Sequence, residues 1–336
     1  MKKFTKPPTI AIVGATGLVG NEILVVLEER KVPVASLRLL ASRDSVGEVY
    51  RFRDDEVVVE ELVEGSFDGI DIALFATSAE LAATFAPKAL AAGATVIDTS
   101  PYFRLRDDVP LVVPEVNMDA LQGDAQLIAN PASSAIQLAP VLHAINEMAG
   151  LEHVVVSTYQ SVSGAGKSAL DELWAQSLAV FNQTEMPQEV FQHQVAFNCI
   201  PHIDLILDNG FSKEEMRIIQ ESQKILALPD LRITATAVRV PIFYGDGASV
   251  FVETKRGITQ EALLSRLRAV RGVALHSAND DFPMQIDVAG TDDIHIGRVR
   301  RDLSVKNGFS FWLVADNVRQ GAAVNLIQIV ERLVVQ

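Results

Sequence analysis

The stretch Thr9-Ile-Ala-Ile-Val-Gly14-Ala-Thr-Gly17-Leu-Val-Gly20 decides the fold expected for the N-terminal part of the chain. Its first five residues form a short apolar, β-branched run, and the residues from Leu18 onward repeat apolar side chains at helical spacing. Glycines between a strand and a helix let the backbone turn tightly, and the helix N-terminus offers free N–H groups to a pyrophosphate. The stretch therefore predicts a dinucleotide-binding turn, although its spacing is G-x-x-G-x-x-G rather than G-x-G-x-x-G.

Strand and helix patterns alternate on both sides of this turn through the first 130 residues. After the strand 9–13, the elements expected are a helix over 18–30, strands over 37–41, 71–76 and 95–98, and an alanine-rich helix over 80–92. Such alternation is typical of parallel βαβ units with right-handed crossovers. The fold class predicted here is α/β, with a Rossmann-type doubly wound parallel sheet.

The pattern changes after Pro131, where longer helices and clustered β-branched strands follow. Helices are expected over 136–149, from about 168, and over 259–270; strands are expected over 153–160, 232–240, 249–254 and 309–315. Strands clustered in this way predict a C-terminal α+β domain with a mixed or antiparallel sheet. A final helix over 321–334 is expected to pack on the first domain. We therefore expect an NADP-binding domain at 1–130, joined by the C-terminal helix 320–336, and a catalytic and dimerisation domain at 131–319.

Charge and composition exclude several classes of partner. The net charge is −14, and the short cluster of Lys2, Lys3 and Lys6 is the only basic run, so neither nucleic acid nor an anionic membrane is expected as a partner. With the single cysteine Cys199 there can be no intrachain disulfide and no cysteine zinc site, and we expect no metal. No stretch resembles a signal peptide or a membrane span, which favours a cytoplasmic protein. A small anionic metabolite remains possible, because a few placed Arg and Lys side chains can bind one.

The residues after the second expected strand bear on the choice of cofactor. An acid there binds the ribose 2′-hydroxyl of NAD, whereas an arginine suits the 2′-phosphate of NADP. Ser42 and Arg43 come first and favour NADP, while Asp44 follows and favours NAD. Arg43 as a solvated loop residue is the alternative interpretation. We predict NADP rather than NAD.

The chain resembles the aspartate-semialdehyde dehydrogenase family nearly end to end. Besides IVGATGLVG and ASRDSVG, the similar stretches are VIDTSPYFRLRDDVPLVVPEVN, NPASSA, YQSVSGAGK, FNCIPHID, ESQKIL, RVPIFYGDG and DNVRQGAAVN. The resemblance implies an N-terminal NADP domain, a C-terminal catalytic and dimerisation domain, and a homodimer. It also implies a place in amino-acid biosynthesis, through the reduction of aspartyl phosphate by NADPH to aspartate semialdehyde. In that reaction a Cys forms the thioester and a His is the acid/base.

Both catalytic positions of the family carry other residues here. Ser133 stands where the family has its Cys, and Asp246 stands where it has its His, while Cys199 belongs to a different block. A serine hydroxyl is far less acidic than a thiol and needs an adjacent base. A carboxylate of ordinary pKa, about 4, has little drive to take a hydroxyl proton. The family reaction is therefore expected to be lost or impaired.

Simpler interpretations of these two residues are also open. Two serines before an apolar helix are typical of an N-cap, so Ser133 is interpreted first as a capping residue and only second as a nucleophile. Asp246 lies in Gly-Asp-Gly, a sequence typical of a turn.

The binding residues that the resemblance implies are better preserved. By the resemblance, Arg104 and Arg239 bind the phosphate and carboxylate of the substrate, Glu221 and Lys224 form a substrate pair, and Gln160 orients the substrate beside the catalytic positions. The implied cofactor residues are Gly14, Thr16, Gly17, Leu18, Val19, Gly20, Ser42, Arg43, Ser163, Gly164 and Asn317. For any one charged residue a surface salt bridge is the alternative, and His202 is interpreted as structural.

Three hypotheses follow for the function. The first is an impaired homologue, in effect a pseudoenzyme, that binds NADP and a small acidic ligand. The second is an active NADP-dependent aldehyde or acyl-phosphate oxidoreductase with non-standard active-site residues. The third is a structural relic or a heteromeric partner of a true dehydrogenase, which predicts no nucleotide binding.

Overall fold

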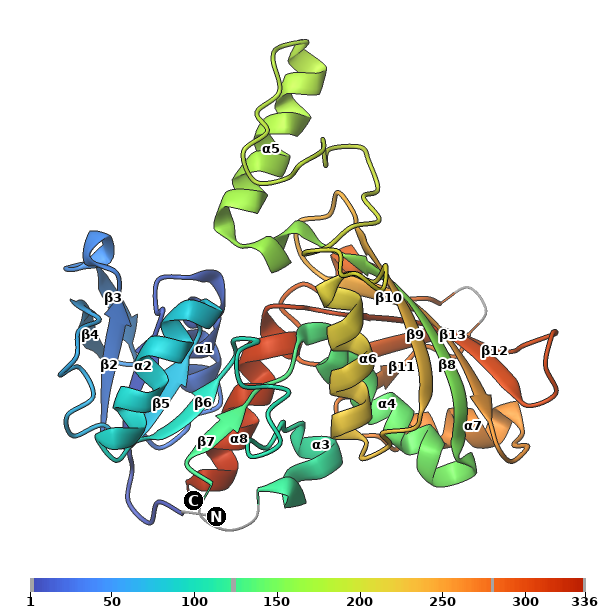
Figure 1. Ribbon diagram of the computed structural model, residues 1–336, viewed down its shortest axis with the longest axis horizontal. Coiled ribbons are helices and arrows are strands. Elements are labelled where there is room, and N and C mark those ends of the chain that lie inside the picture. The colour runs from blue at the N-terminus through green and yellow to red at the C-terminus, as the bar shows by residue number, and fades with distance from the viewer. Residues whose placement is uncertain (1–2, 122–124, 279–280, 335–336) are drawn as a thin grey trace. The chain divides into compact units, whose positions relative to one another are not determined.

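The computed structural model describes residues 3–121, 125–278 and 281–334. The chain divides into two compact units, shown in Figure 1: residues up to Ala132 together with those from Ala322 onward, and Ser133–Gly321. These boundaries fall within two residues of the expected ones, 130 and 320. The expected outer limits, 1 and 336, lie outside the described residues.

The N-terminal unit is built on a seven-stranded sheet of order β3-β4-β2-β1-β5-β6-β7. Its strands are β1 (Thr9–Val13), β2 (Ser36–Ala41), β3 (Val49–Phe52), β4 (Asp55–Glu61), β5 (Ile72–Phe75), β6 (Thr95–Asp98) and β7 (Leu127–Ala129). All pairings are parallel except β3 with β4. Strand β1 pairs with β2 on one side and β5 on the other, so the strand order reverses there. The predicted Rossmann-type sheet is confirmed, and its switch point lies beside the glycine turn.

The helices of this unit include one from the far end of the sequence. They are α1 (Leu18–Glu29), α2 (Ala79–Ala91), α3 (Pro114–Asn117) and α8 (Asn325–Leu333), the last preceded by a π-helical turn over Arg319–Val324. Side chains of α8, among them Ile327 and Val330, are buried in one apolar cluster with Leu27 of α1. The backbone N–H of Phe4 also donates to the carbonyl of Leu333 over 2.8 Å. Helix α8 therefore completes the core of the N-terminal unit.

The C-terminal unit is built on a six-stranded mixed sheet of order β11-β12-β13-β10-β8-β9. Its strands are β8 (Leu151–Gln160), β9 (Arg232–Arg239), β10 (Asp246–Thr254), β11 (Val273–Leu275), β12 (Ile294–Arg301) and β13 (Gly308–Ala315). The pairs β8–β9 and β11–β12 are parallel and the others antiparallel, which confirms the predicted mixed sheet.

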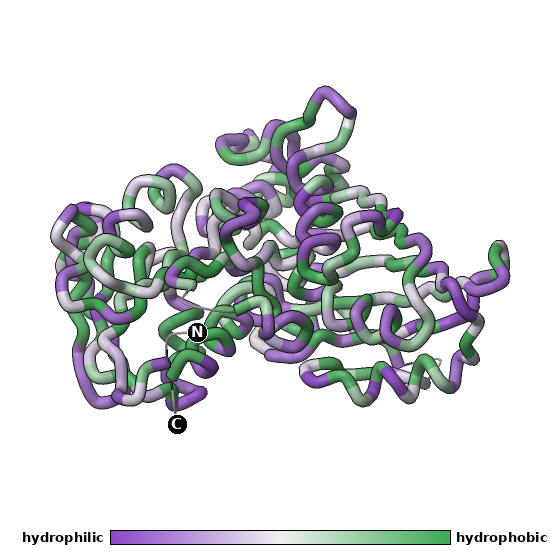
Figure 2. Tube along the Cα trace, turned by 60° about the horizontal axis from the view of Figure 1, so that its bottom comes forward, coloured by the Kyte–Doolittle hydropathy of each residue, from purple (hydrophilic) through white to green (hydrophobic). Residues whose placement is uncertain are grey.

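Four helices belong to the C-terminal unit: α4 (Ser133–Ala149), α5 (Lys167–Asn182), α6 (Lys213–Ile225) and α7 (Gln260–Arg268). Helices α4, α6 and α7 pack against the sheet, and α4 contacts both of the others. Helix α5 stands away from the sheet of its own unit (Figure 1). The mixture of hydrophobic and hydrophilic residues along the outer helices can be followed in Figure 2.

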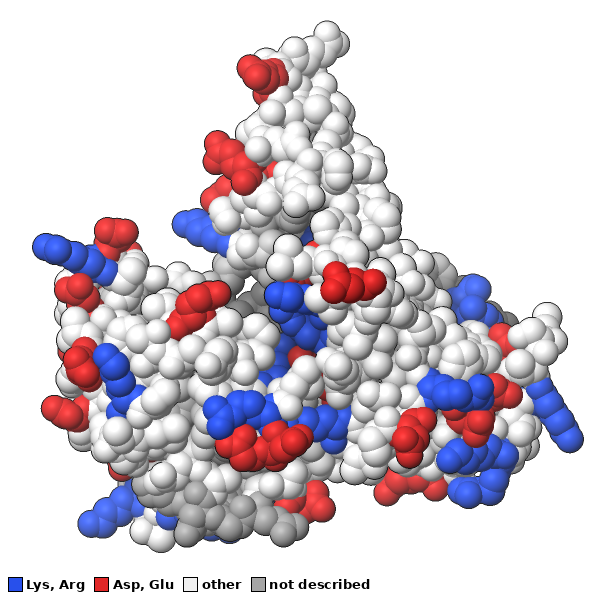
Figure 3. Space-filling model, in the orientation of Figure 1, with Lys and Arg blue, Asp and Glu red and all other residues white. Residues whose placement is uncertain are grey.

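Several elements differ from the expectation. The sequence patterns missed α3, α6, β3, β4, β7, β11 and β12, and they began β10 at 249 instead of at Asp246. Charged residues explain two of these misses, because β4 (DEVVVEE) and α6 (KEEMRIIQESQKI) are rich in acids that hide their apolar pattern. On the face drawn in Figure 3, Lys and Arg side chains are interspersed with Asp and Glu. Among the described residues, no helix is long and apolar enough to cross a bilayer.

Candidate functional site

Two positions in the turn between β1 and α1 require glycine, because the protein's own backbone leaves no room there for a side chain. Gly14 has φ +81°, and a Cβ there would lie 2.3 Å from the carbonyl oxygen of Ala76. A Cβ on Gly20 would lie 2.1 Å from the carbonyl oxygen of Gly14. Only glycine fits at these two positions, because any side chain would overlap the neighbouring backbone.

Gly17 is not explained in the same way. The nearest atom to a Cβ built on it is the carbonyl oxygen of Gly14 at 3.4 Å, an ordinary contact. Gly17 is the N-cap of α1 and makes no side-chain cap, so it leaves the first N–H groups of the helix, those of Leu18 and Val19, without a capping side chain. A bare backbone beside free N–H groups fits the approach of a pyrophosphate, so these residues suit a dinucleotide.

The short turn after β2 adjoins this glycine turn. Ser42 and Arg43 are exposed, and the hydroxyl of Ser45 donates to Thr16 Oγ1 over 3.3 Å. That contact holds the turn against the glycine loop, and Asp44 is exposed on it as well. The arrangement therefore leaves both a cation and an acid available to the ribose end of a dinucleotide.

Arg104 follows β6 in the N-terminal unit and is almost fully buried. Its guanidinium donates to the carbonyl oxygen of Thr99 over 2.5 Å. The neighbouring Asp98, which the sequence patterns did not single out, accepts the N–H and hydroxyl of Ser100 over 3.1 and 2.6 Å. Burial raises the pKa of Asp98 to about 6, although the bonds from Ser100 and the charge of Arg104 act in the opposite direction.

Ser133 lies at the start of α4 in the C-terminal unit. It is the first helical residue, and its hydroxyl donates to Oδ2 of Asp246 over 3.4 Å. The interpretation of Ser133 as a capping residue is therefore wrong, because the hydroxyl faces a side chain 113 positions away along the chain. A bond of this length is weak compared with the usual 2.7–2.8 Å, about the norm for O–H···O contacts.

Asp246 is a buried strand residue and not a turn residue. It begins β10, is 4% exposed, and its Oδ1 accepts the N–H and the hydroxyl of Ser161 over 2.8 and 3.0 Å. The turn lies one residue earlier, where Gly245 has φ +88°. Burial raises the pKa of Asp246 to about 6; the Ser161 bonds and Arg239 lower it, and Glu214 raises it further. The ordinary carboxylate pKa expected from the sequence is therefore wrong for Asp246.

Arg239, the last residue of β9, lies close to this carboxylate. It is 6% exposed and donates to the carbonyl oxygen of Ser161. Burial lowers the pKa of Arg239, while the charges of Asp246 and Glu214 raise it. A Cβ on Gly164 would lie 3.2 Å from Nη1 of Arg239, so the glycine leaves room for the guanidinium.

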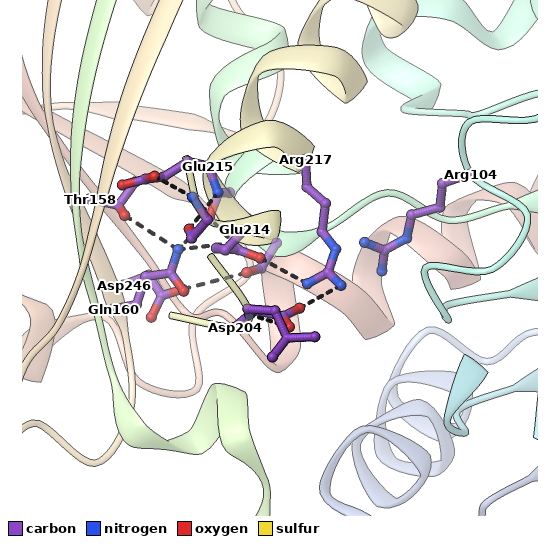
Figure 4. Close-up of polar contacts among 12 residues, drawn as sticks. Arg104, Thr158, Gln160, Asp204, Glu214, Glu215, Arg217 and Asp246 are labelled. Atoms are coloured by element: carbon purple, nitrogen blue, oxygen red, sulfur yellow. Dashed lines mark hydrogen bonds and ion pairs between the residues drawn. The ribbon is translucent and has the colours of Figure 1, made fainter. Parts of the chain in front are cut away.

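Gln160 is held by a second buried carboxylate. Its Nε2 donates to Oε1 of Glu214 over 3.0 Å, to the hydroxyl of Ser134 over 3.2 Å and to that of Thr158 over 3.3 Å. Oε2 of Glu214 accepts from Arg217 over 3.4 Å, and this network is drawn in Figure 4. Because a carboxylate oxygen accepts, Glu214 fixes which way the Gln160 amide points, whereas the two hydroxyls could either donate or accept.

Sequence reasoning missed Glu214 because it missed α6. A detectable signal was present in Ser212-x-x-Glu215, which forms a complete capping box in the structure. Glu221, seven residues after Glu214 on the same helix, is fully buried, and Lys224 is half-buried. Residues seven apart share one helix face, so α6 turns two carboxylates toward the interior of its unit.

Asn317 follows β13 and joins the cofactor residues expected in this unit. Its Oδ1 accepts the hydroxyls of Ser161 and Ser163 and the N–H of Gly245, each over 3.1 Å. The structure thus brings seven expected residues of the C-terminal unit into one locality: Ser133, Gln160, Ser163, Gly164, Arg239, Asp246 and Asn317.

Cys199 and His202 lie outside these contacts. Cys199 is an exposed free thiol, and His202 is half-buried. In the part of the chain that the structure describes, no group of three or more His, Cys, Asp or Glu residues could hold a metal ion.

Comparison with known proteins gives consistent matches over both units. Residues 9–124 match the family model described as "Semialdehyde dehydrogenase, NAD binding domain", and residues 138–320 match "Semialdehyde dehydrogenase, dimerisation domain". The chain is 46% identical to aspartate-semialdehyde dehydrogenase 2 of Vibrio cholerae over 97% of both chains. It is 44% identical to aspartate-semialdehyde dehydrogenase of Aquifex aeolicus over the same shares. The crystal structure of aspartate semialdehyde dehydrogenase II from Vibrio cholerae, complexed with ASA, superposes with a TM-score of 0.96 at 45% identity, covering 98% of both chains.

Proposed function

Because this chain belongs to the aspartate-semialdehyde dehydrogenase family, we propose that it binds NADP and a small acidic ligand, with the family reaction lost or impaired. Its N-terminal unit is the family's domain for a nicotinamide cofactor, and residues 138–320 are the family's dimerisation domain. The family reaction is the NADPH-dependent reduction of aspartyl phosphate to aspartate semialdehyde. The side chains present support binding of NADP and of the ligand, but they do not support the covalent chemistry of the family reaction.

The contact between Ser133 and Asp246 carries this proposal. These residues occupy the positions that the resemblance gives to the nucleophile and its acid/base. Ser133 Oγ lies 3.4 Å from Asp246 Oδ2, while Oδ1 of the same carboxylate is already bonded to Ser161. A hydroxyl joined to its carboxylate by so long a contact is weakly activated, so Ser133 is a poor nucleophile. An ester is also a poorer hydride acceptor than a thioester, so the chain lacks both parts of the covalent route.

Binding of NADP and of an anion rests on groups outside that contact. Arg43, exposed beside the glycine turn, is the cation proposed for the 2′-phosphate of NADP. Arg239 is proposed for the ligand carboxylate, because its guanidinium is buried and can offer a bidentate pair of donors. Lys224, on α6, is proposed as a second cation for the ligand.

A homodimer is proposed through the C-terminal unit. That unit carries an apolar groove of about 770 Å³ whose walls include Phe243, Tyr244, Phe282, Met284, Ile286 and Trp312. Met284 is 50% exposed and Ile286 is 78% exposed. Contiguous exposed apolar surface is typical of protein interfaces. The expected result is a dimer mass by light scattering for the unmodified chain and a monomer mass for Ile286→Glu.

The first experiment measures the phosphate-dependent initial rate of NADP reduction with aspartate semialdehyde. The unmodified protein is compared with the Ser133→Cys, Asp246→His double variant. The proposal predicts no rate for the unmodified chain and a measurable rate for the double variant. Turnover by the unmodified chain at the rate of an active relative contradicts the proposal. A separate NADPH titration excludes the structural-relic hypothesis if it shows binding.

A second candidate function is an active NADP-dependent aldehyde or acyl-phosphate oxidoreductase that uses Ser133 and Asp246. The raised pKa of Asp246 favours it, because a carboxylate with a pKa of about 6 takes a proton more readily than an ordinary one. This candidate predicts a rate for the unmodified chain that Ser133→Ala and Asp246→Asn each abolish. If both variants keep the rate, neither residue takes part in the reaction.

A further inference from the structure

Four buried side chains of the C-terminal unit form one hydrogen-bonded row. From Asp246 the row runs through Ser161 to Asn317 and Ser163, and each of the four is at most 5% exposed. Ser161 Oγ lies 3.0 Å from Asp246 Oδ1, 3.1 Å from Asn317 Oδ1 and 2.9 Å from Ser163 Oγ. Ser163 Oγ lies 3.1 Å from the same Asn317 oxygen and accepts from Asn317 Nδ2 over 2.9 Å. Ser161 is therefore the side chain shared by the carboxylate and the cofactor residues.

The proton count makes this row directional. Ser161 has one hydroxyl hydrogen but three oxygens within bonding distance. When Asp246 is ionised, that hydrogen goes to the carboxylate, because charge-assisted hydrogen bonds are the stronger ones. Asn317 Oδ1 then accepts from Gly245 N–H and from the Ser163 hydroxyl. The Ser163 hydroxyl hydrogen is thus donated to Asn317 and is not available to a ligand.

Protonation of Asp246 reverses the row. The carboxylic acid now donates to Ser161 Oγ, and the Ser161 hydrogen turns toward Asn317 Oδ1. Asn317 no longer needs the Ser163 hydroxyl as a donor. The Ser163 hydrogen becomes available to a bound group, such as the carboxamide oxygen of a nicotinamide.

We propose that Ser161 is a positioning residue that couples protonation of Asp246 to the donor available at Ser163, and so to the affinity for reduced nicotinamide nucleotide. The inference rests on the proposed function and on the resemblance, which implies that Ser163 and Asn317 are cofactor residues. NADPH is the suitable probe because its dihydronicotinamide ring is neutral, so a direct charge interaction with Asp246 does not obscure the effect. In this scheme Ser161 bonds to Asp246 but contacts neither the nucleotide nor the ligand, so it acts on binding only through its neighbours.

The groups around Asp246 set the pH range of the coupling. Arg239 from β9 favours the ionised form, and Glu214 from α6 favours the protonated form. Helix α4 contributes the uncharged Ser133. With burial, the pKa of Asp246 stands at about 6. A ligand carboxylate bound at Arg239 adds negative charge nearby and favours protonation further, so ligand and NADPH are expected to bind cooperatively.

The test is a fluorescence titration of NADPH between about pH 5 and pH 8. For the unmodified protein we expect the affinity to rise about five-fold as the pH falls, the equivalent of one hydrogen bond, with a midpoint near the Asp246 pKa of about 6. The 2′-phosphate of NADPH titrates at about pH 6 too, but it does so equally for every variant. The part of the pH dependence of NADPH affinity that requires Ser161 is therefore the difference between the unmodified protein and the Ser161 variant.

Two variants remove the coupling and one matched variant keeps it. Ser161→Ala breaks the row, and Asp246→Asn cannot titrate, so both are expected to lose the Ser161-dependent five-fold change. Ser310→Ala, on β13 and outside the row, is expected to keep it. Circular dichroism at each pH confirms that the variants are folded.

The outcomes separate this inference from the proposed function. If Ser161→Ala binds NADPH with the same pH dependence as the unmodified protein, the coupling is wrong while NADP binding stands. If the unmodified protein binds no NADPH at any pH, the proposed function is wrong and the coupling falls with it.

Discussion

Gly321 lies so close to Ser133 that a Cβ built on Gly321 would come within 2.6 Å of the Ser133 Cβ. The same atom would lie 3.2 Å from Nε2 of Gln137, one turn further along α4. The absence of a side chain at position 321 therefore allows the first turn of α4 to sit where it does. The position of the Ser133 hydroxyl depends on this glycine as well as on Asp246.

Gly321→Ala is expected to destabilise the protein. The added methyl group overlaps Ser133, and overpacking of this kind costs about 1–3 kcal/mol of unfolding free energy. Urea unfolding measures the change. Gly65→Ala is the matched control, because a Cβ there would meet only Asp68 Oδ2 at 4.0 Å. Equal stability of the two variants contradicts the prediction.

Gly17→Ala and Gly20→Ala are expected to fail in different ways. A methyl group on Gly17 meets no atom closer than 3.4 Å, so the variant should fold normally and lose NADPH binding at least ten-fold. A methyl group on Gly20 lies 2.1 Å from a carbonyl oxygen, so that variant should unfold at lower temperature. Thermal unfolding and NADPH titration of both variants give the comparison. Normal binding by Gly17→Ala would show that no phosphate approaches this backbone.

Asp246→Asn is expected to change how stability depends on pH. The pKa of Asp246 is raised to about 6 in the folded protein, so the native state holds its proton more tightly than the unfolded chain does. The contribution of this proton to the free energy of unfolding is complete below the pKa of Asp246 in the unfolded chain, about 4. It declines as the pH rises through about 6. From pH 4.5 to pH 7.5, the variant should therefore gain about 1–2 kcal/mol relative to the unmodified protein.

The measurement is urea unfolding at both pH values. Asp98, whose pKa is also raised to about 6, provides an independent comparison in the other unit. Asp98→Asn should show the same direction of change, and the double variant should show the sum. A constant difference between Asp246→Asn and the unmodified protein at the two pH values would rule out a raised pKa.

Arg43→Ala is expected to weaken NADPH binding and to leave NADH binding unchanged. Arg43 is exposed, and the partner proposed for its guanidinium is the 2′-phosphate, which NADH lacks. A loss of about ten-fold in NADPH affinity corresponds to about 1.4 kcal/mol. Asp44→Ala, one residue further on, serves as the control and should not weaken NADPH. If Arg43→Ala weakens both nucleotides equally, the preference for NADP does not originate at this residue.

Much of the architecture was predictable because its signals are local. The glycine turn follows β1 and precedes α1, and strands such as β5 and β6 are continuous apolar runs, so the parallel sheet could be inferred from the sequence. Helix α6 was not, because the face it buries carries Glu214 and Glu221. A buried carboxylate looks like a surface residue until its partners, here Gln160 and Arg217, are known.

The environment of the site was less predictable than its residue list. Gly-Asp-Gly is compatible with a turn or with a strand that begins at the aspartate, and only the pairing of Asp246 with Ala315 of β13 decides between them. The raised pKa of Asp246 depends on burial by distant segments. The Ser133 hydroxyl likewise donates to a residue of β10 and not to its own helix. Contacts of such long range leave no periodic trace in the sequence.

The burial of α8 among the side chains of α1 sets an order on how the protein is made. A ribosome releases β1 and α1 early, yet Leu27 and its neighbours are covered only when Ile327 and Val330 have been synthesised. All residues of the C-terminal unit are synthesised before that point. The nascent chain therefore carries an unfinished N-terminal unit until the whole C-terminal unit has been synthesised. The core that contains the earliest residues can be completed only after α8 has been made.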